Sequence, residues 1–304
     1  MNVTNNDNSR ENDWLIKIDK IKKDKDSIHI ETEILESVFE LIKDDNWCVE
    51  FGANDGISGS NTRNFIINKG WSGILIEADK KKALKLIENY RNIKRVVCLK
   101  KFVTFSGPNT LDNILSETQI PKSFGLLSID IDGNDYHIWD SFKSYYPKVV
   151  IIEFNQTFPV NIEFIQPKDM RIKQGSSYRS IVKLGNQKGY ELIAVTEVNA
   201  IFVRKEYFNL FKIKDNSPYM MYNDDKYHTY LYQLYDGTLL VGGNKKLIWH
   251  GKQIRTKEIQ VVHPFFRRFP GDYSYFQKQW IRLNKYILRI LKKSKIGKRL
   301  IKLY

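Results

Sequence analysis

Four apolar segments of the sequence end in acidic residues, and these acids are the side chains best suited to do chemistry. The segments are 47–51, 73–78, 126–132 and 149–154, and the acids at their ends are Glu50, Glu77, Asp79, Asp130, Asp132 and Glu153. Short apolar segments of this kind are typical of buried strands in a parallel sheet. Because the carboxyl ends of parallel strands meet at one edge, the sequence predicts a rim of carboxylates there.

A glycine-containing turn follows the first segment. Gly52 and Gly56 flank Ala53-Asn54-Asp55, and an apolar-periodic segment at 65–67 comes next. Strand, glycine turn and helix form the arrangement in which a nucleotide-like ligand lies over the carboxyl edge of a parallel sheet. The turn has neither the Gly-x-Gly-x-x-Gly pattern nor the phosphate-loop pattern Gly-x-x-x-x-Gly-Lys-[Ser/Thr], which argues against NAD and ATP.

Glu77 and Glu50 have different expected roles beside this turn. Glu77 ends the second segment, where an acid is placed to accept hydrogen bonds from both hydroxyls of a ribose. Glu50 has two interpretations: a contact with the bound ligand, or acceptance of backbone N–H groups from the turn.

The remaining elements must position these acids. We expect helices at 13–25, 34–42, 60–69, 80–91, 110–115 and 135–142 and after a cap at Ser176 or Ser177, and strands at 47–51, 73–78, 95–99 with 102–103, 124–132, 148–154, 191–196 and 199–203. This alternation predicts an α/β protein with a parallel sheet and right-handed crossovers. A tight polar turn separates the last two strands, so this pair should be antiparallel.

Composition indicates a folded cytoplasmic protein. Hydrophobic residues make up 42% of the chain and aromatic residues 13%. No apolar run approaches the ~20 residues that span a bilayer, and the polar N-terminus does not look like a secretory signal. Cys48 and Cys98 lie in strand-like segments and are expected to be reduced core residues. The net charge of +14 permits a nucleic-acid or anionic-membrane partner.

We expect four parts along the chain. Residues 1–33 form a polar segment, disordered over 1–12, and a short helix; 34–205 form the α/β domain; 206–275 form an aromatic-rich extension with β-hairpins; and 276–304 form a basic amphipathic helix. Turns at Asp236-Gly237 and Gly242-Gly243-Asn244 indicate the hairpins. The tyrosines of 219–235 could form a platform for a substrate or the core of an ordinary lobe.

The last part, 276–304, holds ten Lys or Arg and no acid. An apolar stripe at helical spacing runs through it: Trp280, Leu283, Ile287, Ile290 and Leu291. Such a helix can be a solvated face or an oligomer contact. Docking on an anionic membrane is the sharper hypothesis, which would place the protein peripherally at the inner face.

Several motifs together resemble the FkbM-type family of class I S-adenosylmethionine-dependent methyltransferases. They are Glu50-Phe-Gly-Ala-Asn-Asp-Gly56, Leu111-Asp112, Ile129-Asp-Ile-Asp-Gly-Asn-Asp-Tyr136, Val150-Ile-Ile-Glu-Phe-Asn155 and Gly175-Ser-Ser with Gly189-Tyr190, within about residues 35–205. The resemblance implies a Rossmann-like fold of parallel strands with a final antiparallel pair. It also implies S-adenosylmethionine as cofactor and hydroxyl groups of sugars or natural products as acceptors.

The resemblance also implies cofactor contacts. Gly52, Asn54 and Gly56 resemble the family's cofactor loop, and Asp130 lies where the methionine part of the cofactor meets the substrate. We add Glu50, Asp55 and Glu77 to the expected cofactor-binding residues. The loop departs from the commoner Gly-x-Gly-x-Gly form, with Asn54-Asp55 inside it.

Methyl transfer to a hydroxyl requires alignment of the two reactants and removal of a proton. The candidate bases are Asp130, Asp132, Asp135, His137 and Glu153. Asp135 also fits a plain helix cap, and His137 fits a packed or surface histidine. A sugar hydroxyl is a poor acid, so Mg²⁺ would help. The expected metal ligands are Asp130, Asp132, Glu153 and Asn155, because Mg²⁺ prefers hard oxygen ligands.

Three functions compete. The leading hypothesis is an O-methyltransferase that uses S-adenosylmethionine and acts on a sugar hydroxyl of a cell-surface glycan or glycolipid precursor. The positive charge also permits an RNA or DNA methyltransferase, but Glu153-Phe-Asn-Gln-Thr stands where base-modifying enzymes carry Asn-Pro-Pro-Tyr, which makes a nucleic-acid partner unlikely. The third is a non-catalytic glycan-binding protein on a methyltransferase fold.

Overall fold

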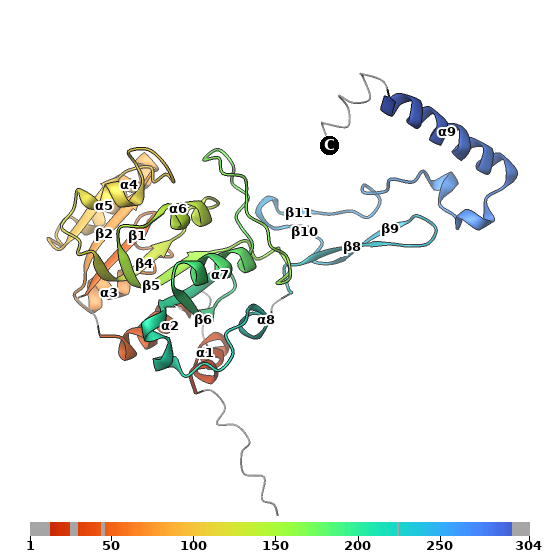
Figure 1. Cartoon of the computed structure of the whole chain (residues 1–304). Helices are drawn as coiled ribbons and strands as arrows, with labels where there is room; N and C mark the ends of the chain where they lie inside the picture. Colours follow the sequence, from red (N-terminus) through yellow and green to blue (C-terminus); the bar gives the residue numbers. More distant parts are fainter. Residues whose placement is uncertain (1–12, 25–29, 44–45, 224, 294–304) are drawn as a thin grey trace, which may run out of the picture. The chain divides into compact units, whose positions relative to one another are not determined.

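The chain forms two compact units, Met1–Asp225 and Lys226–Tyr304, in a computed structural model (Figure 1). The structure describes residues 13–24, 30–43, 46–223 and 225–293. The disorder expected for 1–12 and the end of the basic segment, 294–304, lie outside the described residues. The boundary expected at residue 205 falls inside the first unit, where η1 (Lys205–Phe211) and α8 (Pro218–Met221) contact β6 (Tyr190–Val195).

Seven strands of the first unit form one sheet in the order β3-β2-β1-β4-β5-β7-β6. Their bounds are β1 Trp47–Phe51, β2 Ser72–Glu77, β3 Val96–Lys100, β4 Ser123–Ile129, β5 Tyr146–Glu153, β6 Tyr190–Val195 and β7 Asn199–Arg204. Strands β1 to β5 run parallel, whereas β7 is antiparallel to both β5 and β6. This is the predicted Rossmann-like α/β sheet with a final antiparallel pair, so the predicted fold class is confirmed.

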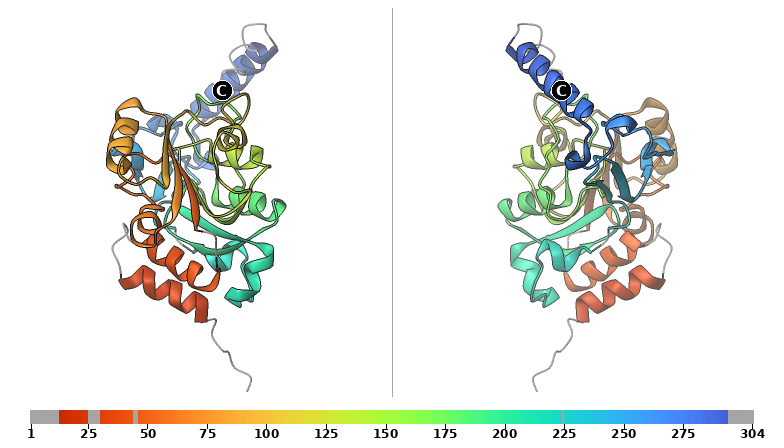
Figure 2. Two further views of the ribbon diagram at one scale, coloured as in Figure 1. Left: turned by 90° about the vertical axis from the view of Figure 1, so that its left-hand side faces the viewer. Right: turned by 90° about the vertical axis from the view of Figure 1, so that its right-hand side faces the viewer.

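Helices alternate with the strands along the chain. Their bounds are α1 Asp13–Asp24, α2 Ile30–Leu41, α3 Arg63–Asn68, α4 Lys80–Tyr90, α5 Leu111–Ser116, α6 Asp135–Ser141 and α7 Tyr178–Gln187. The predicted cap of α7 is Ser177, whose side chain accepts a hydrogen bond from the Ser180 N–H. Helices α1 and α2 lie side by side (Figure 2).

Three predictions near the carboxyl edge of the sheet are wrong. The strand predicted to reach residue 132 ends at Ile129, because Asp132 has a φ of 57°, which a strand does not allow. The helix predicted from residue 60 begins at Arg63, because the hydroxyls of Ser60 and Thr62 are hydrogen-bonded to Glu50. Residues 102–103, predicted as strand, lie beyond the end of β3.

The core centres on β1, β4 and β5. Consecutive residues of these strands are buried on both faces of the sheet, as at Cys48 with Val49 and Val149 with Val150. Burial on both faces explains why the strands are continuous apolar segments in the sequence rather than alternating ones. The thiols of Cys48 and Cys98 are both free, as the sequence predicts.

The second unit contains two hairpins and a long helix. Strand β8 (Thr229–Gln233) pairs antiparallel with β9 (Leu239–Gly243) around the predicted turn at Asp236-Gly237. Gly242 and Gly243 end β9, and the turn between β10 (Lys246–Leu247) and β11 (Lys252–Gln253) lies at 248–251.

The second unit ends in short 3₁₀ turns and a helix. These are η2 Ile248–His250, η3 Pro264–Phe266, η4 Pro270–Asp272 and α9 Tyr275–Lys293. Within the described ranges, no helix combines the length and the apolar character needed to cross a membrane.

Trp14 attaches α1 to the sheet. Its indole N–H donates to the carbonyl of Ile193 at 2.7 Å, and its ring meets that of Phe211 edge-on with centroids 4.7 Å apart. Trp14 is buried, whereas Ile16 on the same helix is exposed. The first helix is therefore part of the α/β unit rather than an appendage to it.

We predict that Trp14→Ala lowers the free energy of unfolding by about 3–5 kcal/mol, the usual effect of truncating a buried aromatic side chain. Ile16→Ala on the exposed face should change it by less than about 1 kcal/mol. Urea denaturation of both variants measures the difference. Equal effects of the two substitutions would contradict the docking of α1 described above.

Candidate functional site

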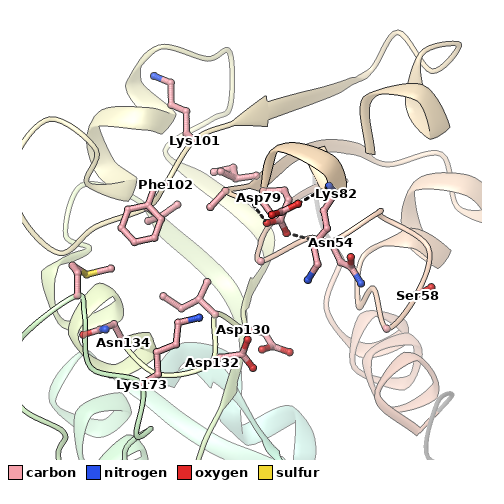
Figure 3. Close-up of a pocket in the computed structure, with 18 residues that line it drawn as sticks. Asn54, Ser58, Asp79, Lys82, Lys101, Phe102, Asp130, Asp132, Asn134 and Lys173 are labelled. Atoms are coloured by element: carbon pink, nitrogen blue, oxygen red, sulfur yellow. Dashed lines mark hydrogen bonds between the residues drawn. The ribbon is translucent and has the colours of Figure 1, made fainter. Parts of the chain in front are cut away.

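A cavity of about 410 Å³ opens at the carboxyl ends of β1, β2 and β4 (Figure 3). Its lining includes Gly52 and Asn54 from the turn after β1, Glu77 from the end of β2, and Asp130 and Asp132 after β4. This is the edge at which the sequence predicts a rim of carboxylates. The volume lies in the range of small-molecule sites.

Gly52 begins the turn after β1 and lies directly against the chain that leaves β4. Its φ is +77°, and a Cβ at this position would come within 1.6 Å of the backbone carbonyl oxygen of Asp130. Only glycine allows the two backbones to approach this closely. The close approach fixes the turn and the segment after β4 relative to each other.

Glu50 anchors the far end of the same turn from inside the protein. Its carboxylate accepts hydrogen bonds from the Ser60 hydroxyl at 2.6 Å, the Thr62 hydroxyl at 2.6 Å and the Asn61 N–H at 2.8 Å. Desolvation raises the pKa of Glu50, and these donors oppose the rise. The geometry gives Glu50 the loop-anchoring role, one of its two predicted interpretations, and its side chain is not part of the cavity lining.

Glu77 holds the turn from the cavity side. One carboxylate oxygen accepts from the Asn54 N–H at 2.8 Å and the other from the Asp79 N–H at 2.7 Å. Asn54 has a φ of 51°, a conformation that points its N–H at this carboxylate. Each carboxylate oxygen keeps a further lone pair, so Glu77 can still accept hydrogen bonds from a ligand in the cavity.

Asp55 and Gly56 shape the turn rather than line the cavity. The Asp55 carboxylate accepts from the N–H groups of Ile57 and Ser58, both at 2.9 Å. Gly56 lies against the ring of Tyr90, whose hydroxyl donates to the Gly56 carbonyl at 2.7 Å. Both were predicted as cofactor contacts, and the structure gives each of them a partner within the protein.

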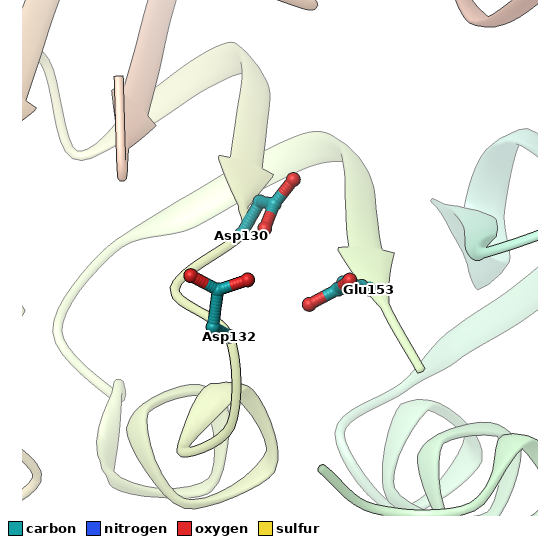
Figure 4. A group of neighbouring side chains, drawn as sticks. All are labelled: Asp130, Asp132 and Glu153. Carbon is teal, nitrogen blue, oxygen red and sulfur yellow. The ribbon is translucent and has the colours of Figure 1, made fainter. Parts of the chain in front are cut away.

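Asp130, Asp132 and Glu153 form a carboxylate cluster at the ends of β4 and β5 (Figure 4). One oxygen from each lies within 4.8 Å of the others. Asp130 is exposed on its cavity side, although protein surrounds its carboxylate on the other sides.

Desolvation raises the pKa of both Asp130 and Glu153, and the repulsion between neighbouring acids adds to the effect. The rise is larger for Glu153, which donates a hydrogen bond to Asp130 when protonated. A shared proton or a bound cation would relieve the repulsion between Asp130 and Glu153. The cluster can therefore accept a proton or bind a divalent ion.

Asn155, the fourth predicted metal ligand, has hydrogen-bond partners within the protein. Its side-chain oxygen accepts from the Thr157 N–H at 2.9 Å and the Thr157 hydroxyl at 2.6 Å, and its amide donates to the Gln174 carbonyl at 2.8 Å. All of these partners belong to the long loop after β5. The residue anchors that loop.

Asp135 and His137 are candidate bases that have structural partners. Asp135 is buried and accepts from the N–H groups of Ile131 and Gly133, both at 2.9 Å, which closes the turn before α6. His137 is buried, its Nε2 lies 2.8 Å from the Gln166 carbonyl oxygen, and its ring packs edge-on against Phe105. Packing is the role that the sequence also allowed for His137. The helix cap predicted at Asp135 is wrong, because Asn134 is the N-cap residue of α6 and the Asp135 side chain bonds the turn before the helix.

The loop from Asn155 to Ser177 supplies cavity residues that the sequence did not single out. Buried Gln166 organises it: its side-chain oxygen accepts from the N–H groups of Gln174 at 3.0 Å and Gly175 at 2.9 Å, and its amide donates to Ile172 at 3.1 Å. The loop thereby contributes Met170 and Lys173 to the cavity lining, which also includes Lys82, Lys101 and Phe102 from other elements. Contacts within an irregular loop leave no periodic pattern in the sequence.

Solved structures that resemble the chain include methyltransferases. A SAM-dependent methyltransferase from Aquifex aeolicus is 13% identical, with 61% of this chain and 96% of that chain covered and a TM-score of 0.35. Magnesium protoporphyrin IX methyltransferase from Synechocystis PCC 6803, with bound SAM, is 10% identical, with 65% and 99% covered and a TM-score of 0.35. The N-terminal domain of EvdMO1, solved with SAH and D-fucose, is 8% identical, with 57% and 82% covered and a TM-score of 0.37.

No family model matches the sequence, and no curated protein matches it. The resemblance to the FkbM-type family therefore stays a prediction. The fold assignment rests on the strand order of the sheet itself, with β7 antiparallel between β5 and β6.

We predict that Gly52→Ala lowers the free energy of unfolding by about 3 kcal/mol or more, because the new methyl group meets a backbone oxygen that cannot move aside. Gly70→Ala is the matched control: Gly70 has a φ of +75° and open space around its Cβ position. In the control, the free energy of unfolding should fall by only about 1–2 kcal/mol, because alanine is strained at a positive φ. Denaturation curves that give the same loss for both variants would rule out the close approach to Asp130.

Proposed function

We propose that the chain is an S-adenosylmethionine-dependent O-methyltransferase that acts on a sugar hydroxyl of a glycan or glycolipid precursor. One observation carries the proposal: a single cavity joins a glycine turn and a fixed ribose-type acid, Glu77, to the carboxylate cluster at the ends of β4 and β5. The glycine turn with Glu77 suits a nucleoside-containing cofactor. The carboxylate cluster suits the removal of a proton from an acceptor.

The cofactor end of the cavity has the donors and acceptors that a nucleoside needs. Glu77 is held by two backbone N–H groups, so its oxygens have fixed positions for ribose hydroxyls. Phe102 borders the same cavity and offers an aromatic face. Lys82 and Asn54 also line the cavity (Figure 3). The bound cofactor would supply an electrophilic methyl group on a sulfonium.

The acceptor end can take up a proton. Methyl transfer is an in-line displacement, so the protein must hold the acceptor oxygen in line with the methyl group and receive its proton. Asp130 faces the cavity and accepts a hydrogen bond from protonated Glu153, which leaves Asp130 as the ionised partner. Asp130 is therefore the base that we assign, with Glu153 as its positioning partner.

A divalent cation at the carboxylate cluster is the alternative route to the same end. The three carboxylates supply the hard oxygen ligands that Mg²⁺ prefers, and Asp130 and Asp132 border the cavity. A cation there would lower the pKa of an acceptor hydroxyl. In that case the cluster would hold the cation in place of the shared proton.

A polar acceptor with several hydroxyls suits this end of the cavity. Asp132 and Lys173 both border it and offer an acceptor and a donor of hydrogen bonds. The two competing functions have less support. The net charge of +14 favours a nucleic-acid substrate, but charge alone does not specify one. A non-catalytic role gives no reason for the close, mutually repelling carboxylates of the cluster.

Calorimetric titration with S-adenosylmethionine and S-adenosylhomocysteine tests the proposal. We expect micromolar binding, about −8 kcal/mol. Glu77→Ala should abolish the preference for 5′-methylthioadenosine over its 2′,3′-dideoxy analogue, a preference of about 10- to 100-fold in the unchanged protein. The ratio of the two affinities separates a ribose contact from a general collapse of the turn. Absence of binding to either cofactor form would overturn the proposed function.

Titration with Mn²⁺ distinguishes the two routes of proton removal. If a cation occupies the carboxylate cluster, Asp132→Asn should weaken Mn²⁺ binding about tenfold or more. Asp79→Asn is the control, because it removes an acid from the same cavity while asparagine still caps α4. No Mn²⁺ binding by the unchanged protein would exclude the cation and leave the shared proton.

A further inference from the structure

Helix α9 carries an apolar face that no part of the second unit covers among the described side chains. Phe276, Trp280, Leu283 and Ile287 follow one another at spacings of four, three and four residues, and their exposed fractions are 80%, 50%, 52% and 42%. This spacing places them on one side of the helix. Ile290 and Leu291, which the sequence adds to the stripe, have side chains outside the described part of the chain.

A basic face runs along the opposite side of α9. Lys278, Arg282, Lys285 and Arg289 repeat the spacing of the apolar face, displaced by two residues, and all four are exposed. A displacement of two residues is about 200° around a helix. The segment 275–293 contains no acidic residue, so these cations have no partner of opposite charge within the helix.

The start of α9 is fixed to the second unit. Ser274 and Gln277 form a capping box: the Gln277 N–H donates to the Ser274 hydroxyl at 3.3 Å, and the Ser274 N–H donates to the Gln277 side chain at 2.9 Å. The Gln277 amide also donates to the Phe265 carbonyl at 2.9 Å. The apolar face is thus presented by an anchored helix.

We propose that α9 lies in the headgroup region of an anionic lipid bilayer, parallel to the surface. The apolar face would enter the acyl boundary, and the long basic side chains would extend to the anionic headgroups. Trp280 and Tyr286 carry both apolar and polar atoms, which suits them to this interface. The inference goes beyond the proposed function and does not depend on the identity of the acceptor.

A lipid surface matches both faces of α9, whereas other partners match one. Nucleic acid would neutralise the basic face but leave the apolar face in water. A second copy of the chain could cover the apolar face, but it would leave the basic face, on the opposite side of the helix, without anionic partners. Of these three partners, the bilayer is the one that offers both apolar and anionic groups within the thickness of a single helix.

Vesicle co-sedimentation of the full chain tests this proposal. We expect binding to an equal mixture of phosphatidylcholine and phosphatidylglycerol, and little binding to phosphatidylcholine alone. Lys285→Gln with Arg289→Gln should reduce the partition coefficient about 30-fold, from two lost contacts with the anionic surface. Lys252→Gln with Lys257→Gln, outside α9, makes the same change of net charge and should leave binding near that of the unchanged protein.

A second pair of variants tests the apolar face without changing charge. Leu283→Asn with Ile287→Asn should also reduce vesicle binding about tenfold or more, with the helical circular dichroism signal unchanged. Brominated lipids should quench the tryptophan fluorescence of the bound protein. The quenching should be weaker in Trp280→Phe, because the proposal places the indole of Trp280 in the membrane.

Three results would overturn the proposal. The first is equal binding to both kinds of vesicle, and the second is binding that survives both double substitutions. The third is a protein that does not sediment with vesicles. Such a protein would instead bind RNA, or form a dimer that Leu283→Asn with Ile287→Asn dissociates.

Discussion

The contact between Gly52 and the backbone of Asp130 determines the geometry of the carboxyl edge. The first strand pair of the site, β1 with β4, is parallel, so both chains leave the sheet at the same level. The two backbones pass each other closely before they diverge, and this is possible because Gly52 has no side chain. The turn after β1 then follows the edge of the sheet toward Glu77, and the segment after β4 turns toward α6. The cavity lies between the turn after β1 and the segment after β4.

The acids of the edge divide into two groups by what they bind. Glu50 and Glu77 bind backbone N–H groups or hydroxyls of the turn, so their charges are already compensated within the protein. Asp130 and Glu153 mainly face each other, which is unfavourable for two negative charges and raises the pKa of both. Two carboxylates held this close by the fold have an increased affinity for a proton or a cation. The first group holds the turn in place, and the second remains able to bind a proton or a cation.

The sequence predicts the sheet well because both of its signals are local. Apolar segments bounded by glycine or acid mark the buried strands, and the short polar turn between β6 and β7 indicates their antiparallel pairing. The same reasoning locates Glu77 and the carboxylate cluster, since strand ends meet at one edge whatever the loops do. It does not reveal the partners of Asn155, one of which, Gln174, lies nineteen residues away. It also left the role of Glu50 open, since that depends on where Ser60 and Thr62 fold back. Contacts between loops depend on the whole fold and have no periodic trace.

The loop after β5 has a consequence for how the molecule could change over evolutionary time. Its backbone is held by side-chain amides that include buried Gln166, Asn134 and Asn155. Asn134 donates to the carbonyls of Asp169 and Ile172, and Asn155 donates to that of Gln174. The residues that reach the cavity from this loop, Met170 and Lys173, take no part in that internal scaffold. Single substitutions at these two positions would therefore alter the wall of the cavity while the loop kept its path. Successive single substitutions could therefore change which ligands fit the cavity, while the fold stays the same.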